Sequence, residues 1–212
     1  MASLSESVGP PNAAQSKGSH RAQAGADPES LPRERPAYEQ LALHPIVLAA
    51  SAALVVADLA RFGFGARAVA GLVLLPALVV LSAIDIRHRL LPNRIVLPAT
   101  GLVLFSQLAL ARDHGLEAAV ASFAAAAGLL IIRAAYPQGL GMGDVKLALL
   151  LGAALGKGVM FALFVGSVAA AVAGLVVIAR DGMAARKTAL PFGPFLAVGA
   201  AAAFFLAVPP HI

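Results

Sequence analysis

The chain has 212 residues, of which 59% are hydrophobic and only 13% are charged. Soluble domains carry about 25% charged residues, and several apolar stretches here reach roughly the 18 residues with which a helix crosses a bilayer. The chain has a net charge of +5 and no cysteine, which excludes disulfides, thiolate metal sites and cysteine nucleophiles. Its basic residues lie in short loops between apolar segments, so they indicate membrane topology and no nucleic-acid partner.

Residues 1–42 differ from the rest of the chain. They are rich in Pro, Ser, Gly and charged residues and have almost no large apolar side chains. Such a segment buries too little surface to offset its ordering entropy, so we predict a disordered cytoplasmic tail. No apolar h-region follows Met1, so no cleavable signal peptide is expected and the first apolar segment serves as the anchor.

The remaining apolar segments predict an all-α, polytopic membrane bundle that occupies residues 43–208 and is followed by a short tail at 209–212. The seven expected transmembrane segments are 43–60, 67–84, 95–111, 116–134, 145–156, 158–179 and 189–208. The fifth segment is short and ends at Gly156-Lys157-Gly158. It is expected to be either a half-buried helix or a tight hairpin with the sixth segment.

The basic residues near the segment ends are distributed unequally between the two sides. With seven segments, one side collects Arg33, Arg35, Arg87, Arg89, Arg94, Arg133, Lys146, Arg180, Arg186 and Lys187. The other side collects Arg61, Arg67, Arg112 and Lys157. This bias predicts a cytoplasmic N-terminus and an external C-terminus, and it weakens if the fifth and sixth segments are merged.

Two acidic residues lie where apolar segments meet the predicted cytoplasmic side. Asp85 ends the second segment and Asp144 begins the fifth. Ionisable groups at membrane depth usually face a bundle interior or a cavity. Two carboxyl groups brought together there cannot both ionise easily, so they tend to share a proton. One can then take a proton from water while the other donates to a carbonyl oxygen, which is peptide hydrolysis without a metal or covalent intermediate.

Glycines precede the second acid in the stretch GLGMGDVKLAL at 139–149. Gly141 and Gly143 permit close approach of another chain, so they are expected to let an extended substrate reach Asp144. Two alternatives exist. The glycines can instead pack helices closely, as small residues do in membranes. A phosphate-binding loop is disfavoured because no Gly-Lys-Ser/Thr follows and no strand precedes the stretch.

Three stretches in chain order resemble the signature motifs of the type IV prepilin peptidases, which are membrane aspartic peptidases of the GxGD class. They are DIRHRLLPN at 85–93, GMGDVKL at 141–147 and LPFGPFLAVGA at 190–200. The resemblance implies a six-helix protease core, to which 43–60 adds an extra span. It also implies that Asp85 and Asp144 are the catalytic pair and that no metal or other cofactor is required. Substrate or structural roles are expected for Lys146, Pro92, Asn93, Pro191, Phe192, Gly193 and Pro194.

Larger members of that family carry a cytoplasmic segment with paired CxxC motifs, which is associated with N-methylation. This chain has no cysteine and is similar to the short, peptidase-only members of the Flp/Tad pilus type. The resemblance implies cleavage of the leader, after a glycine, from prepilin-like single-span precursors at the cytoplasmic face of the bacterial inner membrane. Those precursors and membrane lipid are the expected partners.

A proton- or cation-coupled transporter that uses the same two acids is the alternative function. The chain shows no repeated halves of the kind that transporters carry, so the motif order favours the peptidase.

Other polar residues are expected to be structural or solvated. Asp58 and Arg61 lie three residues apart and are predicted to pair on one helix face. Lys146 is expected either to neutralise Asp144 or to bind substrate, and Pro92-Asn93 is expected to form a turn. Surface positions are predicted for His88, Asp113, His114, Glu117 and Asp181.

Overall fold

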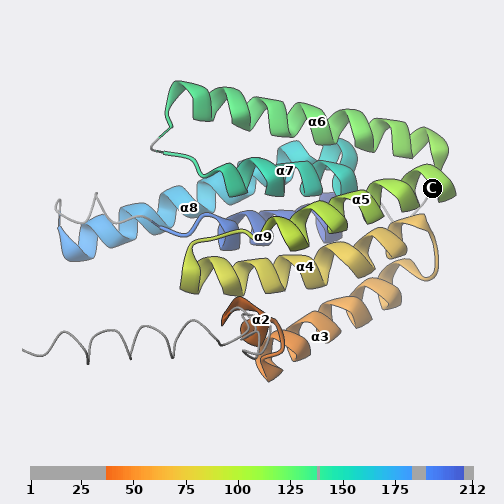
Figure 1. Cartoon of the computed structure of the whole chain (residues 1–212), viewed down its shortest axis with the longest axis horizontal. Helices are drawn as coiled ribbons and strands as arrows, with labels where there is room; N and C mark the ends of the chain where they lie inside the picture. Colours follow the sequence, from red (N-terminus) through yellow and green to blue (C-terminus); the bar gives the residue numbers. More distant parts are fainter. Residues whose placement is uncertain (1–36, 138, 183–189, 208–212) are drawn as a thin grey trace, which may run out of the picture. The chain divides into compact units, whose positions relative to one another are not determined.

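The computed structural model describes residues 37–137, 139–182 and 190–207. Within these ranges the regular elements are all helical, and Figure 1 shows them as a bundle. The helices are α2 (Ala37–Ala42), α3 (Pro45–Phe62), α4 (Ala66–His88), α5 (Asn93–Leu110), α6 (Arg112–Ala135), α7 (Met142–Leu155), α8 (Val159–Asp181) and α9 (Gly193–Ala202). A 3-10 turn at Gly156–Gly158 joins α7 to α8, and a π-helical turn at Ala203–Ala207 follows α9. The predicted all-α fold class is confirmed.

Each of the seven predicted apolar segments corresponds to one helix, from α3 to α9, with bounds shifted by a few residues. Five stretches of the described chain are long and apolar enough to cross a membrane, so the chain is a polytopic integral membrane protein. Residues 37–42, which the prediction placed in the N-terminal tail, form α2. The rest of that tail, the tail at 209–212, and Arg186 and Lys187 lie outside the described residues.

Consecutive helices alternate in direction, so particular helix ends meet at each end of the bundle. At one end α4 finishes and α5, α7 and α9 begin, which is the left end in Figure 1. We call this the Asp85 end, after the acidic residue in the last turn of α4. The opposite end carries the α3–α4, α5–α6 and α7–α8 connections.

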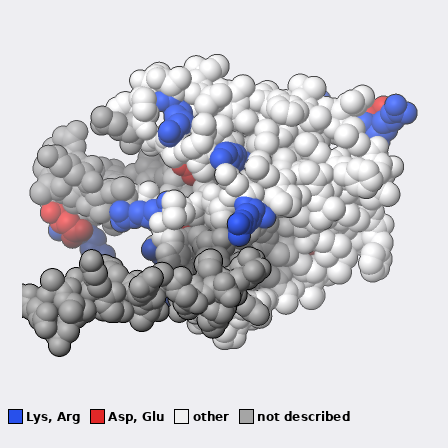
Figure 2. Space-filling view, in the orientation of Figure 1, with Lys and Arg blue, Asp and Glu red and all other residues white. Residues whose placement is uncertain are grey.

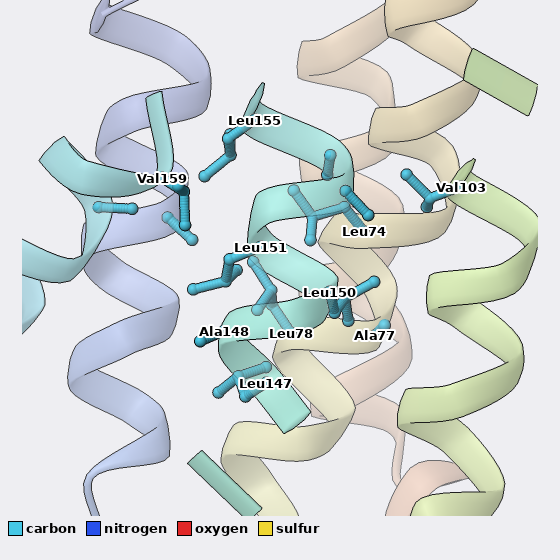
Figure 3. Close-up of a cluster of buried hydrophobic side chains, with 14 of the residues drawn as sticks. Leu74, Ala77, Leu78, Val103, Leu147, Ala148, Leu150, Leu151, Leu155 and Val159 are labelled. Carbon is cyan, nitrogen blue, oxygen red and sulfur yellow. The ribbon is translucent and has the colours of Figure 1, made fainter. Parts of the chain in front are cut away.

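Helix α7 forms the centre of the hydrophobic core. It has 14 residues, of which ten are buried, and Figure 3 shows Leu147 and Leu150 directed among Leu78 of α4 and its neighbours. A 14-residue helix is about 21 Å long, shorter than the roughly 30 Å hydrocarbon layer. The surrounding helices enclose α7, and beyond Asp144 and Lys146 its apolar surface on all sides fits that position. Gly156 ends the helix with φ of 54°, a conformation that favours glycine.

Small residues bring α6 and α7 into close contact. A Cβ on Gly152 would overlap the backbone of Ser122, and the Ser122 hydroxyl donates a hydrogen bond to the carbonyl oxygen of Leu149. A glycine also allows close contact between α8 and α9, because a Cβ on Gly199 would overlap the carbonyl oxygen of Ala162. Membrane helices associate in this way because small residues let their backbones approach.

Asp58 is fully buried on α3, and its electrostatic partner is Arg67 on α4. The Arg67 guanidinium also donates to the Phe204 carbonyl oxygen at 2.8 Å and lies 4.3 Å from the Phe62 ring centroid. The sequence predicted Arg61 as the partner from its spacing within one helix. That prediction was wrong because Asp58 faces the neighbouring helix, close to Gly71.

Glu117 is not simply solvated, contrary to the sequence-based expectation. Its carboxylate lies 3.1 Å from Lys157 Nζ and accepts a second hydrogen bond from the Lys157 backbone N–H at 3.4 Å. Glu117 thus closes the turn between α7 and α8. Asp113 and Asp181 are exposed, as is His88.

We expect Gly152→Ala to destabilise the protein by about 2 kcal/mol, because its methyl group overlaps backbone atoms that cannot move aside. Gly128→Ala on α6 is the matched control, since a Cβ there meets no atom within 4 Å. Alanine favours a helix over glycine by up to about 1 kcal/mol, so this control should be neutral or more stable. Thermal unfolding in detergent measures both, and equal stability of the two variants would contradict the close α6–α7 contact.

Candidate active site

Asp85 lies in the last turn of α4 and is 6% exposed. The helix ends four residues later at Arg89, which has φ of 51° and donates its N–H to the Asp85 carbonyl oxygen at 2.9 Å. The chain then turns through Leu90-Leu91-Pro92 into α5, as the predicted Pro92-Asn93 turn requires. Asp85 is therefore held at the end of an apolar helix with its side chain turned inward.

The third sequence motif supplies the hydrogen-bond donor for Asp85. Gly193 is the first residue of α9, and its N–H donates to Asp85 Oδ2 at 2.8 Å across 108 residues of sequence. The first N–H groups of a helix have no partner within the helix and favour a negative charge. A Cβ on Gly193 would lie 2.7 Å from that oxygen, so the contact requires glycine.

The residues around Gly193 build the start of α9. Pro194 occupies the first turn, where a missing N–H costs nothing. Phe192 packs against the hydrophobic core, and Pro191 is half-buried beside it. Of these four residues, Gly193 contacts Asp85 directly, and the others belong to the segment that begins α9.

Asp144 is the third residue of α7 and is 8% exposed. Its Oδ2 accepts a hydrogen bond from the Gly141 N–H at 3.1 Å, and its own N–H donates to the Gly141 carbonyl oxygen at 3.2 Å. This reciprocal pair has the form of a capping box, in which an acid three residues into a helix bonds the residue that starts it. Asp144 therefore fixes the start of its own helix.

Two contacts join the segments that carry the two acids. A Cβ on Gly143 would lie 2.8 Å from Leu91 Cδ1, so the α4–α5 connection packs directly on the glycine. Lys146 Nζ donates to Asn93 Oδ1 at 2.7 Å, which ties α7 to the first residue of α5. These contacts place the first turn of α7, which carries Asp144, against the connection that follows Asp85.

These contacts change two of the sequence-based interpretations. Gly141 and Gly143 were expected to leave room for a substrate. In the structure the Leu91 side chain packs directly on Gly143, and the Gly141 N–H bonds Asp144 at the start of α7. Their close-packing alternative describes these glycines better. Lys146 bonds Asn93 rather than Asp144. The sequence did not identify Leu91 as the residue that packs on Gly143, although Leu91 lies inside the first motif.

The surface around the acids is basic. Arg87, Arg89 and Arg94 are exposed near the ends of α4 and α5, whereas Asp85 and Asp144 are buried. Figure 2 shows most of the Lys and Arg side chains of this view toward the left, with one further group beside an acidic one at the right. The charge distribution thus distinguishes the Asp85 end from the opposite end, as the sequence predicted.

The arrangement suits acid–base chemistry on water. Two buried carboxyl groups lie at the same end of the bundle, and each is oriented by one backbone N–H. A pair of this kind can divide the roles of proton acceptor and proton donor. Among the described residues, no group of three or more His, Cys, Asp or Glu side chains is placed to bind a metal ion.

The comparisons with known proteins point to one family. Residues 72–175 match the model of the type IV leader peptidase family. The chain is 34% identical over 171 residues to a protein of Xanthomonas campestris pv. campestris named prepilin leader peptidase/N-methyltransferase, covering 76% of this chain and 58% of that protein. A Burkholderia pseudomallei protein of the same name is 37% identical over 177 residues, covering 79% and 56%. The chain thus spans less than two thirds of these relatives, and no solved structure matches it.

We expect the Lys146–Asn93 hydrogen bond to couple the stabilities of the two segments. A double-mutant cycle with Lys146→Met and Asn93→Ala should give a coupling free energy of about 1 kcal/mol in detergent unfolding. Pairing Lys146→Met with Asp113→Asn is the control cycle, because Asp113 is exposed in the first turn of α6 at the opposite end. Additive effects in the first cycle would show that this bond contributes nothing.

Proposed function

Because residues 72–175 match the model of the type IV leader peptidase family, we propose that this chain is an aspartic endopeptidase of that family. Its reaction is removal of the leader peptide from prepilin-like precursors. The single observation that carries the proposal is that Asp85 and Asp144 lie at the same end of the bundle, each buried and each bonded to a backbone N–H.

In the proposed reaction the two carboxyl groups hold one proton and one water between them. The ionised member takes a proton from the water, whose oxygen attacks the carbonyl carbon of the scissile bond. The protonated member donates to the carbonyl oxygen, and the resulting intermediate collapses as the amine leaves with a proton. The Gly193 and Gly141 N–H groups keep both acids aimed at this water throughout.

The position of the acids suits a precursor with one apolar helix. At the Asp85 end, a short leader can remain among water and headgroups while the following helix lies in lipid. The scissile bond, placed after a glycine, would then be extended at the junction between the two environments. We place the Asp85 end at the cytoplasmic face of the bacterial inner membrane, with the N-terminus cytoplasmic, because the basic residues gather there.

The relatives' name joins two activities, and we propose only the leader peptidase activity for this chain. All three motif stretches have contacts in the structure that organise the two acids. The sequence has no cysteine for a paired CxxC segment and is similar to the peptidase-only Flp/Tad type. Its proposed partners are single-span precursors and membrane lipid. The comparisons lend no support to the alternative of a proton- or cation-coupled transporter.

We expect Asp85→Asn and Asp144→Asn each to reduce precursor cleavage by at least about a thousandfold, since a water-activating pair requires both carboxyl groups. The measurement is loss of the leader by mass spectrometry after co-expression with candidate prepilin-like precursors.

Asp181→Asn is the matched control, because Asp181 is an exposed acid at the end of α8 on the same side of the bundle. It should retain full activity at equal expression. Cleavage by either variant of the proposed pair would remove that residue from the mechanism.

We expect Gly143→Ala to slow cleavage about tenfold while the inserted protein stays folded, because the new methyl group separates α7 from Leu91. Leu91→Ala removes two of the three atoms that this methyl would meet, so the double variant should recover part of the lost rate. Rates are measured per amount of inserted protein. If Leu91→Ala deepens the defect of Gly143→Ala, the packing explanation is wrong.

A further inference from the structure

The connection from α6 to α7 carries the residue that caps Asp144, and it is fixed at several points. Tyr136 ends α6 with its N–H bonded to the Ile132 carbonyl oxygen at 2.8 Å, and Gly139 N–H then bonds the Tyr136 carbonyl oxygen at 3.1 Å. The Tyr136 ring covers Gly139 so closely that a Cβ there would overlap it. The remaining step, from Leu140 to Gly141, leads directly to the acid.

A charged side chain holds that step from the other side. Arg133, half-buried in the last turn of α6, donates from Nη1 to the Leu140 carbonyl oxygen at 2.5 Å. This oxygen belongs to the same peptide unit as the Gly141 N–H, which donates to Asp144 Oδ2. Because a peptide unit is planar, fixing its oxygen also fixes the direction of its N–H.

We propose that Arg133 is a positioning residue for the reaction, acting on Asp144 through the Leu140–Gly141 peptide unit. The inference rests on the proposed function, since it assigns a role within that same site. No sequence motif contains Arg133, and its charge entered the sequence analysis only as a topology signal.

Glycine makes such a restraint necessary. Gly141 has no Cβ, so rotation of the peptide unit before it is little hindered, and the N–H can turn away from Asp144. An alanine at 141 would not solve this, because its Cβ would lie 3.0 Å from Asp144 Oδ2. Arg133, on α6, therefore restrains the Leu140–Gly141 peptide unit, which a side chain at position 141 cannot do.

The charge of Arg133 adds a second effect. Hydrogen bonds in a chain polarise one another in surroundings of low dielectric. A guanidinium on the carbonyl oxygen therefore makes the N–H of the same peptide unit a stronger donor to Asp144. A lysine can reproduce the charge and one hydrogen bond, whereas a methionine of similar length reproduces neither.

A general role at a helix end is the competing explanation, because basic residues in a last turn also interact with the helix dipole. Arg180 provides the comparison. It lies in the last turn of α8 at the same end of the bundle, and no hydrogen bond joins it to another described residue. A role in topology or in the dipole predicts equal effects at the two arginines.

The test compares Arg133→Met, Arg133→Lys and Arg180→Met in steady-state cleavage of a purified precursor. We expect Arg133→Met to lower kcat about tenfold to a hundredfold, because small displacements of a reacting group have effects of that size. KM should change less than about twofold, Arg133→Lys should recover most of kcat, and Arg180→Met should match the parent. Equal kcat for Arg133→Met and the parent, or a loss that appears mainly in KM, would overturn the proposal.

A spectroscopic measurement decides the same point without cleavage. The chain has no cysteine, so Met142→Cys gives a single attachment site for a spin label, at an exposed first residue of α7. Adding Arg133→Met should sharpen the label's spectrum, because the start of α7 is then less restrained and the label moves faster. Adding Arg180→Met should leave the spectrum unchanged. An unchanged spectrum with Arg133→Met would overturn the restraint, whereas sharpening in a protein whose parent cleaves no precursor would count against the peptidase function alone.

Discussion

The structure depends on one constraint, which is that two carboxyl groups inside an apolar bundle each need a backbone N–H. Only the first turn of a helix offers such groups unpaired, so the beginnings of α7 and α9 have to lie where α4 ends. Gly141 bonds Asp144 within α7, and Gly193 of α9 bonds Asp85 of α4. The antiparallel order of the helices brings these ends together, so the connectivity of the fold and the placement of its acids have the same cause.

Close packing then sets how near the acids come. Gly143 allows Leu91 to lie on the first turn of α7, and Lys146 bonds Asn93 one turn further on. Both contacts fix α7 against the α4–α5 connection. Helix α7 can serve in this way because other helices enclose it and its side chains are almost uniformly apolar. A cluster of glycines before an acid thus produces a rigid, well-packed corner of the bundle.

Hydropathy was sufficient to predict α3 to α9, because the bilayer imposes a length and a composition on every span, whereas α2 was missed. The cost of ionisable groups within apolar segments identified Asp85 and Asp144. The partners of Asp58 and Lys146 were beyond such reasoning, because each is set by the rotation of one helix against another. Gly143 shows the same limit: its sequence indicates that space is needed, whereas only the structure shows that Leu91 fills it. The motif around Gly193 was recognised, but its physical role lay in a contact across 108 residues.

The short length of α7 has a consequence for how the protein enters the membrane. Fourteen residues with an aspartate and a lysine in the first two turns partition poorly into lipid alone. The 23 residues of α8 are apolar up to the last turn, which carries Arg180 and Asp181, and the helix is long enough to cross. The two helices therefore integrate as one hairpin closed by the Gly156–Gly158 turn, after α6 is in place to receive them. Asp144, in the first turn of α7, is in this sense carried into the bilayer by the helix that follows.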